Sequence, residues 1–286
     1  MRPGVSFRIN PLFLLVVVVF ALAGLFTEAI ISIVLVITHE FIHLLVAYRL
    51  GYRPGKIELF PFGGMAEYSG LLEMNPGDEI KVAGAGPLYN LAMAGIFYLI
   101  YMLTPHNLYL LIVKYNLVLS FFNLIPALPL DGGRVFRALM VYNSGFKRGT
   151  LIAVKLAKIL AISGAVMGGV CVLLNKSNLW VLLISFFVYG ASLKEENQIV
   201  YRLVRYLTRR RQENINLTIS PVVNKVVRGE MQVEEVIYHL NPVKYNIFIV
   251  LDSKMRLSGI ITESQLIDSF FRLKKHNIKL NDIIRK

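Results

Sequence analysis

The pentapeptide HEFIH at residues 39–43 lies in the middle of an apolar run, residues 28–50, and it decides the fold. An α-helix rises about 1.5 Å and turns about 100° per residue, so side chains four residues apart stack on one face, about 6 Å apart along the axis. That separation lets His39 and His43 bind one metal ion together. Glu40 lies beside the first histidine, where it can act as a general base toward a water molecule.

The same spacing also occurs in soluble helices, where it is a solvated pattern without function. Here the flanking residues 31–37 and 44–47 are nearly all apolar, which excludes a solvated charged face. Two histidines and a carboxylate are costly inside a membrane helix unless they face a cavity or meet partners. The sequence therefore favours a metal site over a surface pattern.

The composition is that of a membrane protein. Hydrophobic residues make up 55% of the 286 residues and charged residues 17%, whereas a soluble protein carries about 25% charged residues. Several runs approach the roughly 20 apolar residues that span a bilayer. We expect an α-helical polytopic membrane protein with about six transmembrane helices, approximately at 11–26, 28–50, 80–103, 108 into 123, 151–174 and 179–193.

The first apolar run and the loop charges bear on topology. Residues 21–23, Ala-Leu-Ala, would suit cleavage of a signal peptide. The next apolar segment follows almost at once, so we expect a retained first span instead. Lys and Arg gather in the segments that an inside N-terminus places in the cytoplasm, as the positive-inside rule requires. We therefore expect a multi-pass protein of the bacterial cell membrane with both termini in the cytoplasm.

Between the second and third spans, residues 51–74 are rich in Gly and Pro and contain short alternating pieces. This pattern indicates a small membrane-associated β-hairpin or sheet. Pro61, Phe62, Gly63 and Gly64 make a tight turn of nearly bare backbone, and a strand edge at such a place can bind an extended peptide. We expect these four residues to contact substrate; the alternative is an ordinary amphipathic loop.

The third span opens with GAGPLYN at residues 84–90. Small residues allow close packing of helices, and we expect Gly84 and Gly86 to serve this packing. The polar Asn90 is expected to hydrogen-bond to a peptide substrate or to a ligand. His106 lies in a short turn and is expected to be a loop residue rather than a ligand. The single cysteine, Cys171, excludes an intrachain disulfide and a cysteine-based zinc site.

The fourth span runs into NLIPALPLDGGR at residues 123–134, whose prolines and glycines must break the helix. A catalytic zinc takes three protein ligands and leaves one position open. Asp131 is the natural third ligand to His39 and His43, and Asn123 is placed to orient substrate or the developing oxyanion. Taken alone, Asp131 is more simply a helix cap, but HEFIH in the same membrane region favours the ligand.

The C-terminal part is more polar and more basic. Residues 196–215 are expected to form a basic juxtamembrane linker, and residues 216–286 a small soluble α/β domain. The net charge of +13 is weighted toward these residues, which favours contact with anionic lipid or an acidic partner. Nucleic acid is not an expected partner, because no aromatic residues interleave with the charge. The patterns predict helices at 233–240 and 264–271 and strands at 246–251 and 257–262.

HEFIH, PFGG, GAGPLYN and NLIPALPLDGGR occur in an order that resembles the site-2 protease family of intramembrane zinc metalloproteases, peptidase family M50. The resemblance implies that His39, His43 and Asp131 ligate one zinc ion per chain. It also implies that Glu40 activates water and that Asn123 assists substrate binding or the transition state. The expected activity is that of a zinc metalloendopeptidase, and the expected protein substrate has a membrane-associated segment.

The resemblance to these proteases covers residues 1–195, the expected transmembrane domain. Residues 216–286 resemble a single CBS motif with a core at 257–262. CBS motifs usually work in pairs and often sense adenine nucleotides. The resemblance therefore implies homo-oligomers through CBS pairing, and it raises ATP as a second ligand. Against ATP, Gln265 stands where many nucleotide-binding members have an acid.

A six-span protease with one C-terminal CBS domain is similar to the stage IV sporulation protein FB group. That group cleaves the pro-sequence of a mother-cell sigma factor at the forespore membrane and is restrained by partner membrane proteins. Other membrane substrates stay open, such as an anti-sigma factor or a signal-peptide remnant. So do a zinc-binding membrane transporter or scaffold, and a catalytically inactive regulator driven by the CBS-like domain.

Overall fold

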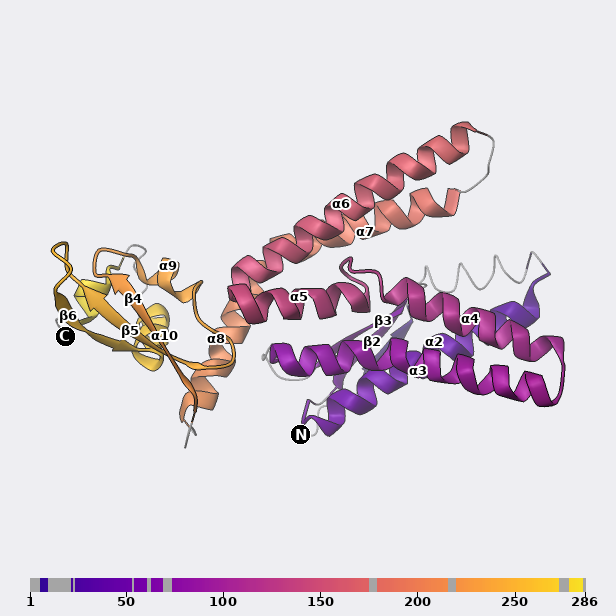
Figure 1. Ribbon diagram of the computed structural model, residues 1–286, viewed down its shortest axis with the longest axis horizontal. Helices are drawn as coiled ribbons and strands as arrows, with labels where there is room; N and C mark the ends of the chain where they lie inside the picture. Colours follow the sequence, from indigo (N-terminus) through magenta and orange to yellow (C-terminus); the bar gives the residue numbers. More distant parts are fainter. Residues whose placement is uncertain are drawn as a thin grey trace.

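The helices and strands form two regions joined by one helix (Figure 1). The computed structural model describes residues 6–9, 22, 24–52, 54–60, 63–68, 74–174, 179–215, 220–272 and 278–284. Helices α2 to α7 and a small sheet make up the first region. A second sheet with helices α9, α10 and α11 makes up the C-terminal region, and α8 lies between the two.

The helices of the first region are α2 (Phe26–Arg49), α3 (Pro76–Leu103), α4 (Asn107–Asn123), α5 (Asp131–Ser144), α6 (Phe146–Leu173) and α7 (Leu179–Asn197). Among the described residues, α2, α3 and α6 are long and apolar enough to cross a membrane. Helix α4 has 17 residues and α7 has 19. A mostly helical fold is confirmed, and six spans remain a prediction. Most of the expected first span, 11–26, lies outside the described residues.

Small side chains let these helices approach one another closely. Helices α6 and α7 lie side by side over most of their length (Figure 1), and the buried cluster between them contains Ala153, Ala157, Ala161 and Val188. Helix α3 packs against α2, α4 and α5. The outer surfaces of the helices carry exposed apolar side chains that suit contact with lipid, among them Ile30, Leu99, Val166 and Phe186.

The expected hairpin after the second helix is present. Strands β2 (Pro54–Phe60) and β3 (Gly63–Tyr68) pair antiparallel, and β1 (Ser6–Ile9) pairs parallel to β2. The strand order β1-β2-β3 leaves β3 at an edge of this sheet, and both β2 and β3 contact α2. The pattern of four residues in β1 is too short to predict a strand, because only its pairing with distant β2 makes it one.

In the C-terminal region, β4 (Val222–Arg228) pairs parallel to β5 (Tyr245–Leu251), and β5 pairs antiparallel to β6 (Leu257–Thr262). The helices are α9 (Val233–Ile237), α10 (Glu263–Arg272) and α11 (Leu280–Ile284). The two strands and two helices that the sequence predicts here are therefore present, and β4 and α11 are additions. The CBS-like assignment itself remains a prediction.

Residues of the expected linker form a helix, α8 (Ile199–Ile215), which is attached to both regions. Leu203, Tyr206 and Leu207 are buried in the same core as Phe248 of β5. On the other side, the Arg202 guanidinium donates to the Glu195 carboxylate of α7 at 2.7 Å. Helix α8 thus packs as a structural element of the C-terminal core and is tied to the membrane helices.

The corner between α5 and α6 also packs against the C-terminal region. A Cβ atom built on Gly145, which has φ +82°, would lie 2.8 Å from the carbonyl oxygen of Tyr238. The ammonium nitrogen of Lys147 lies 3.6 Å from the centre of the Tyr238 ring. Val141 of α5 and Phe146 of α6 belong to the C-terminal core. Helix α5 therefore ends inside that core.

Candidate metal centre

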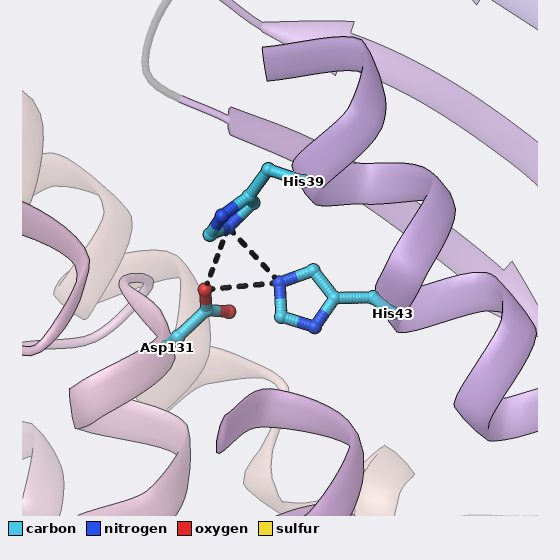
Figure 2. Close-up of side chains that lie close together, drawn as sticks. All are labelled: His39, His43 and Asp131. Carbon is cyan, nitrogen blue, oxygen red and sulfur yellow. Dashed lines mark hydrogen bonds and ion pairs between the residues drawn. The ribbon is translucent and has the colours of Figure 1, made fainter. Parts of the chain in front are cut away.

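Three side chains from two helices converge on one point inside the membrane helices (Figure 2). Helix α2 presents His39 and His43 on one face, with their Nε2 atoms 3.1 Å apart. Asp131, the first residue of α5, places Oδ2 3.1 Å from Nε2 of His39 and 3.0 Å from Nε2 of His43. These residues form the His-His-Asp group that the described part of the chain offers to a metal ion.

The geometry and the chemistry of this group fit zinc. A tetrahedral zinc site with bonds of about 2.0–2.1 Å places its ligand atoms about 3.3 Å apart, close to the observed separations. Two imidazoles and one carboxylate are ligands that zinc favours, and three protein ligands leave a fourth position open. His39, His43 and Asp131 have only 1%, 3% and 8% of their surface exposed. A shared ion accounts for these three polar groups in an apolar setting.

Helix α3 fixes the orientation of both imidazole rings. Nδ1 of His43 donates to the carbonyl oxygen of Val82 at 2.6 Å, and Nδ1 of His39 lies 3.0 Å from Oδ1 of Asn90. A carbonyl oxygen only accepts, so the proton of each neutral ring belongs on Nδ1. Each Nε2 lone pair then points toward the other ligands, which is the arrangement of a metal-binding histidine.

Asp131 lies near the histidines because the chain between α4 and α5 turns tightly, with its backbone packed against the start of α5. A Cβ atom built on Gly132 would lie 2.2 Å from the carbonyl oxygen of Leu124, and one on Gly133 would lie 2.3 Å from the carbonyl carbon of Ala127. Only glycine fits at both positions. The motif glycines thus let α5 begin directly against the chain that leaves α4, and Asp131 stands at that start.

The structure also places the other predicted site residues. Glu40 is buried on α2, 8% exposed, and lies near enough to His43 to interact with it electrostatically. Asn123 is buried at the end of α4, and its amide donates to the carbonyl oxygen of Leu119 at 3.1 Å. Asn90 is fully buried behind His39. The catalytic and substrate roles predicted for these residues remain predictions.

The predicted peptide-binding turn is described only in part. Gly63 and Gly64 open β3, opposite Phe60 and Leu59 of β2. Pro61 and Phe62 lie outside the described residues. His106 is exposed and begins α4 as its N-cap, where its ring accepts from the backbone N–H of Leu108 at 3.2 Å. The prediction of a loop histidine is therefore confirmed.

Two groups at the site were not identified from the sequence. The carbonyl of Val82 is a backbone group, so the residue type at this position does not indicate its role. Gly86 was assigned only to helix packing, whereas a Cβ atom built on it would lie 2.4 Å from Nε2 of His43. The available signal was its place in GAGPLYN, four residues before Asn90 and so on the same helix face.

Comparison with known proteins agrees with the site. The model of peptidase family M50 matches residues 27–108, which contain α2, the hairpin and α3. The solved site-2 protease from Methanocaldococcus jannaschii aligns with a TM-score of 0.55 and 30% identity, over 68% of this chain and 91% of that chain. The fold is similar to that of this solved site-2 protease. The chain belongs to the site-2 protease family, peptidase family M50.

Two curated relatives are similar to different extents. The zinc metalloprotease MJ0392 of Methanocaldococcus jannaschii is 31% identical over 78% of this chain and 62% of its own length. Stage IV sporulation protein FB of Bacillus subtilis is 23% identical over 97% of this chain and 95% of its own length. Three further curated metalloproteases are matched over 42% to 44% of their length.

Proposed function

We propose that this protein is an intramembrane zinc metalloendopeptidase that cleaves a membrane-embedded or membrane-associated protein segment. The observation that carries the proposal is the buried His-His-Asp group, whose two histidines lie on α2, a helix long and apolar enough to cross a membrane. Glu40 follows the first histidine on that helix. Family membership and the zinc metalloproteases among the relatives support the same activity.

His39, His43 and Asp131 would hold the zinc ion. When bound, zinc would act as a Lewis acid that polarises a carbonyl and lowers the pKa of water to about 7. Glu40 removes a proton from the attacking water and later delivers it to the leaving amine. Asn123 orients the substrate or donates to the developing oxyanion.

Substrate must reach the site unwound, because a helix holds its carbonyl groups in internal hydrogen bonds. The edge position of β3 supports binding of an extended segment by strand addition, since that strand also contacts α2. The turn at residues 61–64 and Asn90 remain the predicted contacts with the peptide. Strand addition would supply main-chain hydrogen bonds and would not depend strongly on the peptide sequence.

For the biological substrate we propose a sigma-factor pro-sequence cleaved during sporulation. The similarity to stage IV sporulation protein FB over nearly the whole of both chains supports this choice. The protein would lie in a mother-cell forespore membrane. It would cross that membrane six times, with both termini in the cytoplasm, and partner membrane proteins would restrain its activity. An anti-sigma factor or a signal-peptide remnant is the alternative substrate. Pairing of the CBS-like domains into homo-oligomers, and ATP binding there, remain predictions.

The proposal is tested by co-expressing the protein with a tagged sigma-factor pro-sequence and by measuring zinc in the purified full chain. We expect a shorter product with wild type and about one zinc per chain. Glu40→Gln should keep the zinc and lose cleavage, and His43→Ala should lose both. Cleavage by Glu40→Gln at the wild-type rate would refute the role of Glu40 as the general base.

Two other outcomes separate the alternatives. Zinc binding without any product from this substrate would keep the protease assignment and contradict the sigma-factor proposal, and an anti-sigma factor would be tried next. Zinc binding with no cleavage of any membrane substrate, together with zinc transport into vesicles, would favour the transporter.

A further inference from the structure

We propose that Asn90 is a positioning residue that holds the zinc ligand His39 in its binding orientation and thereby sets the zinc affinity of the site. The inference rests on the proposed zinc site but goes beyond it, since the sequence pointed to Asn90 as a contact of the peptide. Oδ1 of Asn90 lies 3.0 Å from Nδ1 of His39, and the Asn90 side chain is fully buried.

The first step of the argument is the chemistry of the imidazole. A neutral histidine carries one proton on either ring nitrogen, and the other nitrogen keeps the lone pair that binds a metal. The Asn90 oxygen accepts from Nδ1, so it stabilises the form with a free lone pair on Nε2. It also fixes the rotation of the ring, because the Nδ1–H must point at a stationary oxygen.

The second step is that α3 serves both histidines in the same way. Val82, Gly86 and Asn90 are spaced four residues apart, so they share one face of α3. Val82 provides the oxygen for His43, and Asn90 provides the oxygen for His39. Gly86 lies between them, where a side chain would meet both rings. Each of the two histidines on α2 therefore has its own acceptor oxygen on α3.

The third step is that Asn90 is itself held in place. Three residues before it, the carbonyl oxygen of Pro87 accepts a hydrogen bond from Oγ of Ser120 at 2.9 Å, which ties α3 to α4. Ser120 and Asn90 are both fully buried. A side chain enclosed in this way has few rotamers available, so its oxygen can act as a fixed support.

Helix α4 offers a matched control. Asn116 is also a fully buried asparagine, and its amide donates to the carbonyl oxygen of Ile112 at 2.9 Å within its own helix. Each of the two asparagines leaves one buried amide atom, Nδ2 of Asn90 and Oδ1 of Asn116, without a hydrogen-bond partner in the described part of the protein. They differ in that only Asn90 has a recorded contact with a ligand histidine. Replacement of either by leucine removes a buried amide of similar size.

The experiment measures the zinc dissociation constant of the purified full chain by competition with a chelator. We expect Asn90→Leu to bind zinc about 10- to 100-fold more weakly than wild type, which is the usual cost of losing such a support. Asn116→Leu should bind zinc as wild type does. Asn90→Asp keeps an acceptor oxygen and should restore affinity close to the wild-type value. If Asn90→Leu does not fold, Asn90→Ala takes its place.

The contrary outcomes are distinct. Zinc affinity of Asn90→Leu within about twofold of wild type, with a raised KM for cleavage, would overturn the inference and return Asn90 to substrate binding. If Asn116→Leu weakened zinc binding as much as Asn90→Leu does, the loss of affinity would be explained by a general loss of packing, and the inference would be overturned. Failure of wild type to bind zinc would overturn the proposed function, and this inference with it.

Discussion

Gly86 of α3 lies so close to His43 of α2 that no side chain fits between them. A Cβ atom built on Gly86 would be 2.4 Å from Nε2 of His43 and 2.6 Å from Cε1 of His39. The helix backbone itself therefore forms one wall of the metal centre. A methyl group at this position would occupy the space next to the atoms that bind the ion.

Replacement of Gly86 by alanine is expected to abolish zinc binding and cleavage. The added methyl group must push both imidazoles away, and the three ligand atoms then no longer converge. The zinc content of the purified variant and its cleavage of a tagged substrate are the two measurements. Gly84→Ala in the same motif is the matched control, because a Cβ atom there meets nothing within 4 Å. Normal zinc content in Gly86→Ala would show that α3 can move away.

A buried ion pair between α5 and α3 is expected to carry a large part of the stability of the first region. The Arg137 guanidinium donates to Glu79, lies 3.6 Å from Oε2 of Glu195, and is 5% exposed. Replacing Arg137 by methionine leaves the buried Glu79 carboxylate without the guanidinium that donates to it, which costs about 3–5 kcal/mol, whereas Glu195 keeps its pair with Arg202. Thermal unfolding in one detergent should show the loss as a clear decrease in Tm.

The control for Arg137→Met is a surface ion pair on α3, the helix that carries Glu79. The ammonium group of Lys81 lies 3.4 Å from Asp78, and the Lys81 side chain is 63% exposed. Exposed pairs contribute about 0–1 kcal/mol, so Lys81→Met should change Tm little. Equal changes in the two variants would contradict the importance of the buried pair.

Besides its apolar core contacts, α8 is attached to the C-terminal region through Arg210. Arg210 donates to both carboxylate oxygens of Glu263, at 2.8 and 3.0 Å, and Glu263 is fully buried. We expect Arg210→Leu to destabilise the C-terminal region by about 3–5 kcal/mol, because it removes the guanidinium that donates to the buried Glu263 carboxylate. Hydrogen exchange of the β5 amides reports this loss directly, since β5 lies in the middle of the sheet.

The neighbouring residue provides the comparison. Arg211 pairs with Asp268 at 2.8 Å, but the two side chains are 45% and 37% exposed. Arg211→Leu should therefore leave the exchange rates of β5 nearly unchanged. Protection lost to the same degree in both variants would mean that the charge of α8, and not its buried pair, stabilises the sheet.

The convergence of His39, His43 and Asp131 could be predicted because their signals in the sequence are local, and their role as metal ligands remains a prediction. Helix geometry alone places the two histidines of HEFIH on one face. Their apolar surroundings indicate that they need polar partners, because unpaired polar groups are costly there. Asp131 was less certain from its own surroundings, since a proline- and glycine-rich turn also suits a helix cap. The structure places its carboxylate with both histidines.

The features that could not be predicted depend on contacts between distant segments. Strand β1 exists only through its pairing with β2, and the Val82 carbonyl carries no residue signature. The basic pattern of residues 196–215 suggested a juxtamembrane linker, but Arg210 of α8 pairs with Glu263 inside the fold. Burial of a charge is decided by its partner, and the partner here is 53 residues away.

Helix α5 has a metal ligand at its first residue and a place in the C-terminal core at its last turn. Its 14 residues span about 21 Å, and Val141 near the far end belongs to that core. Free energies of binding at two ends of one rigid element are reciprocal. Binding of the ion should therefore slow opening of the C-terminal sheet. A molecule that binds the sheet should change the affinity for the ion by the same factor by which the ion changes the affinity for that molecule. The region of the candidate metal centre and the C-terminal region then form one thermodynamic unit.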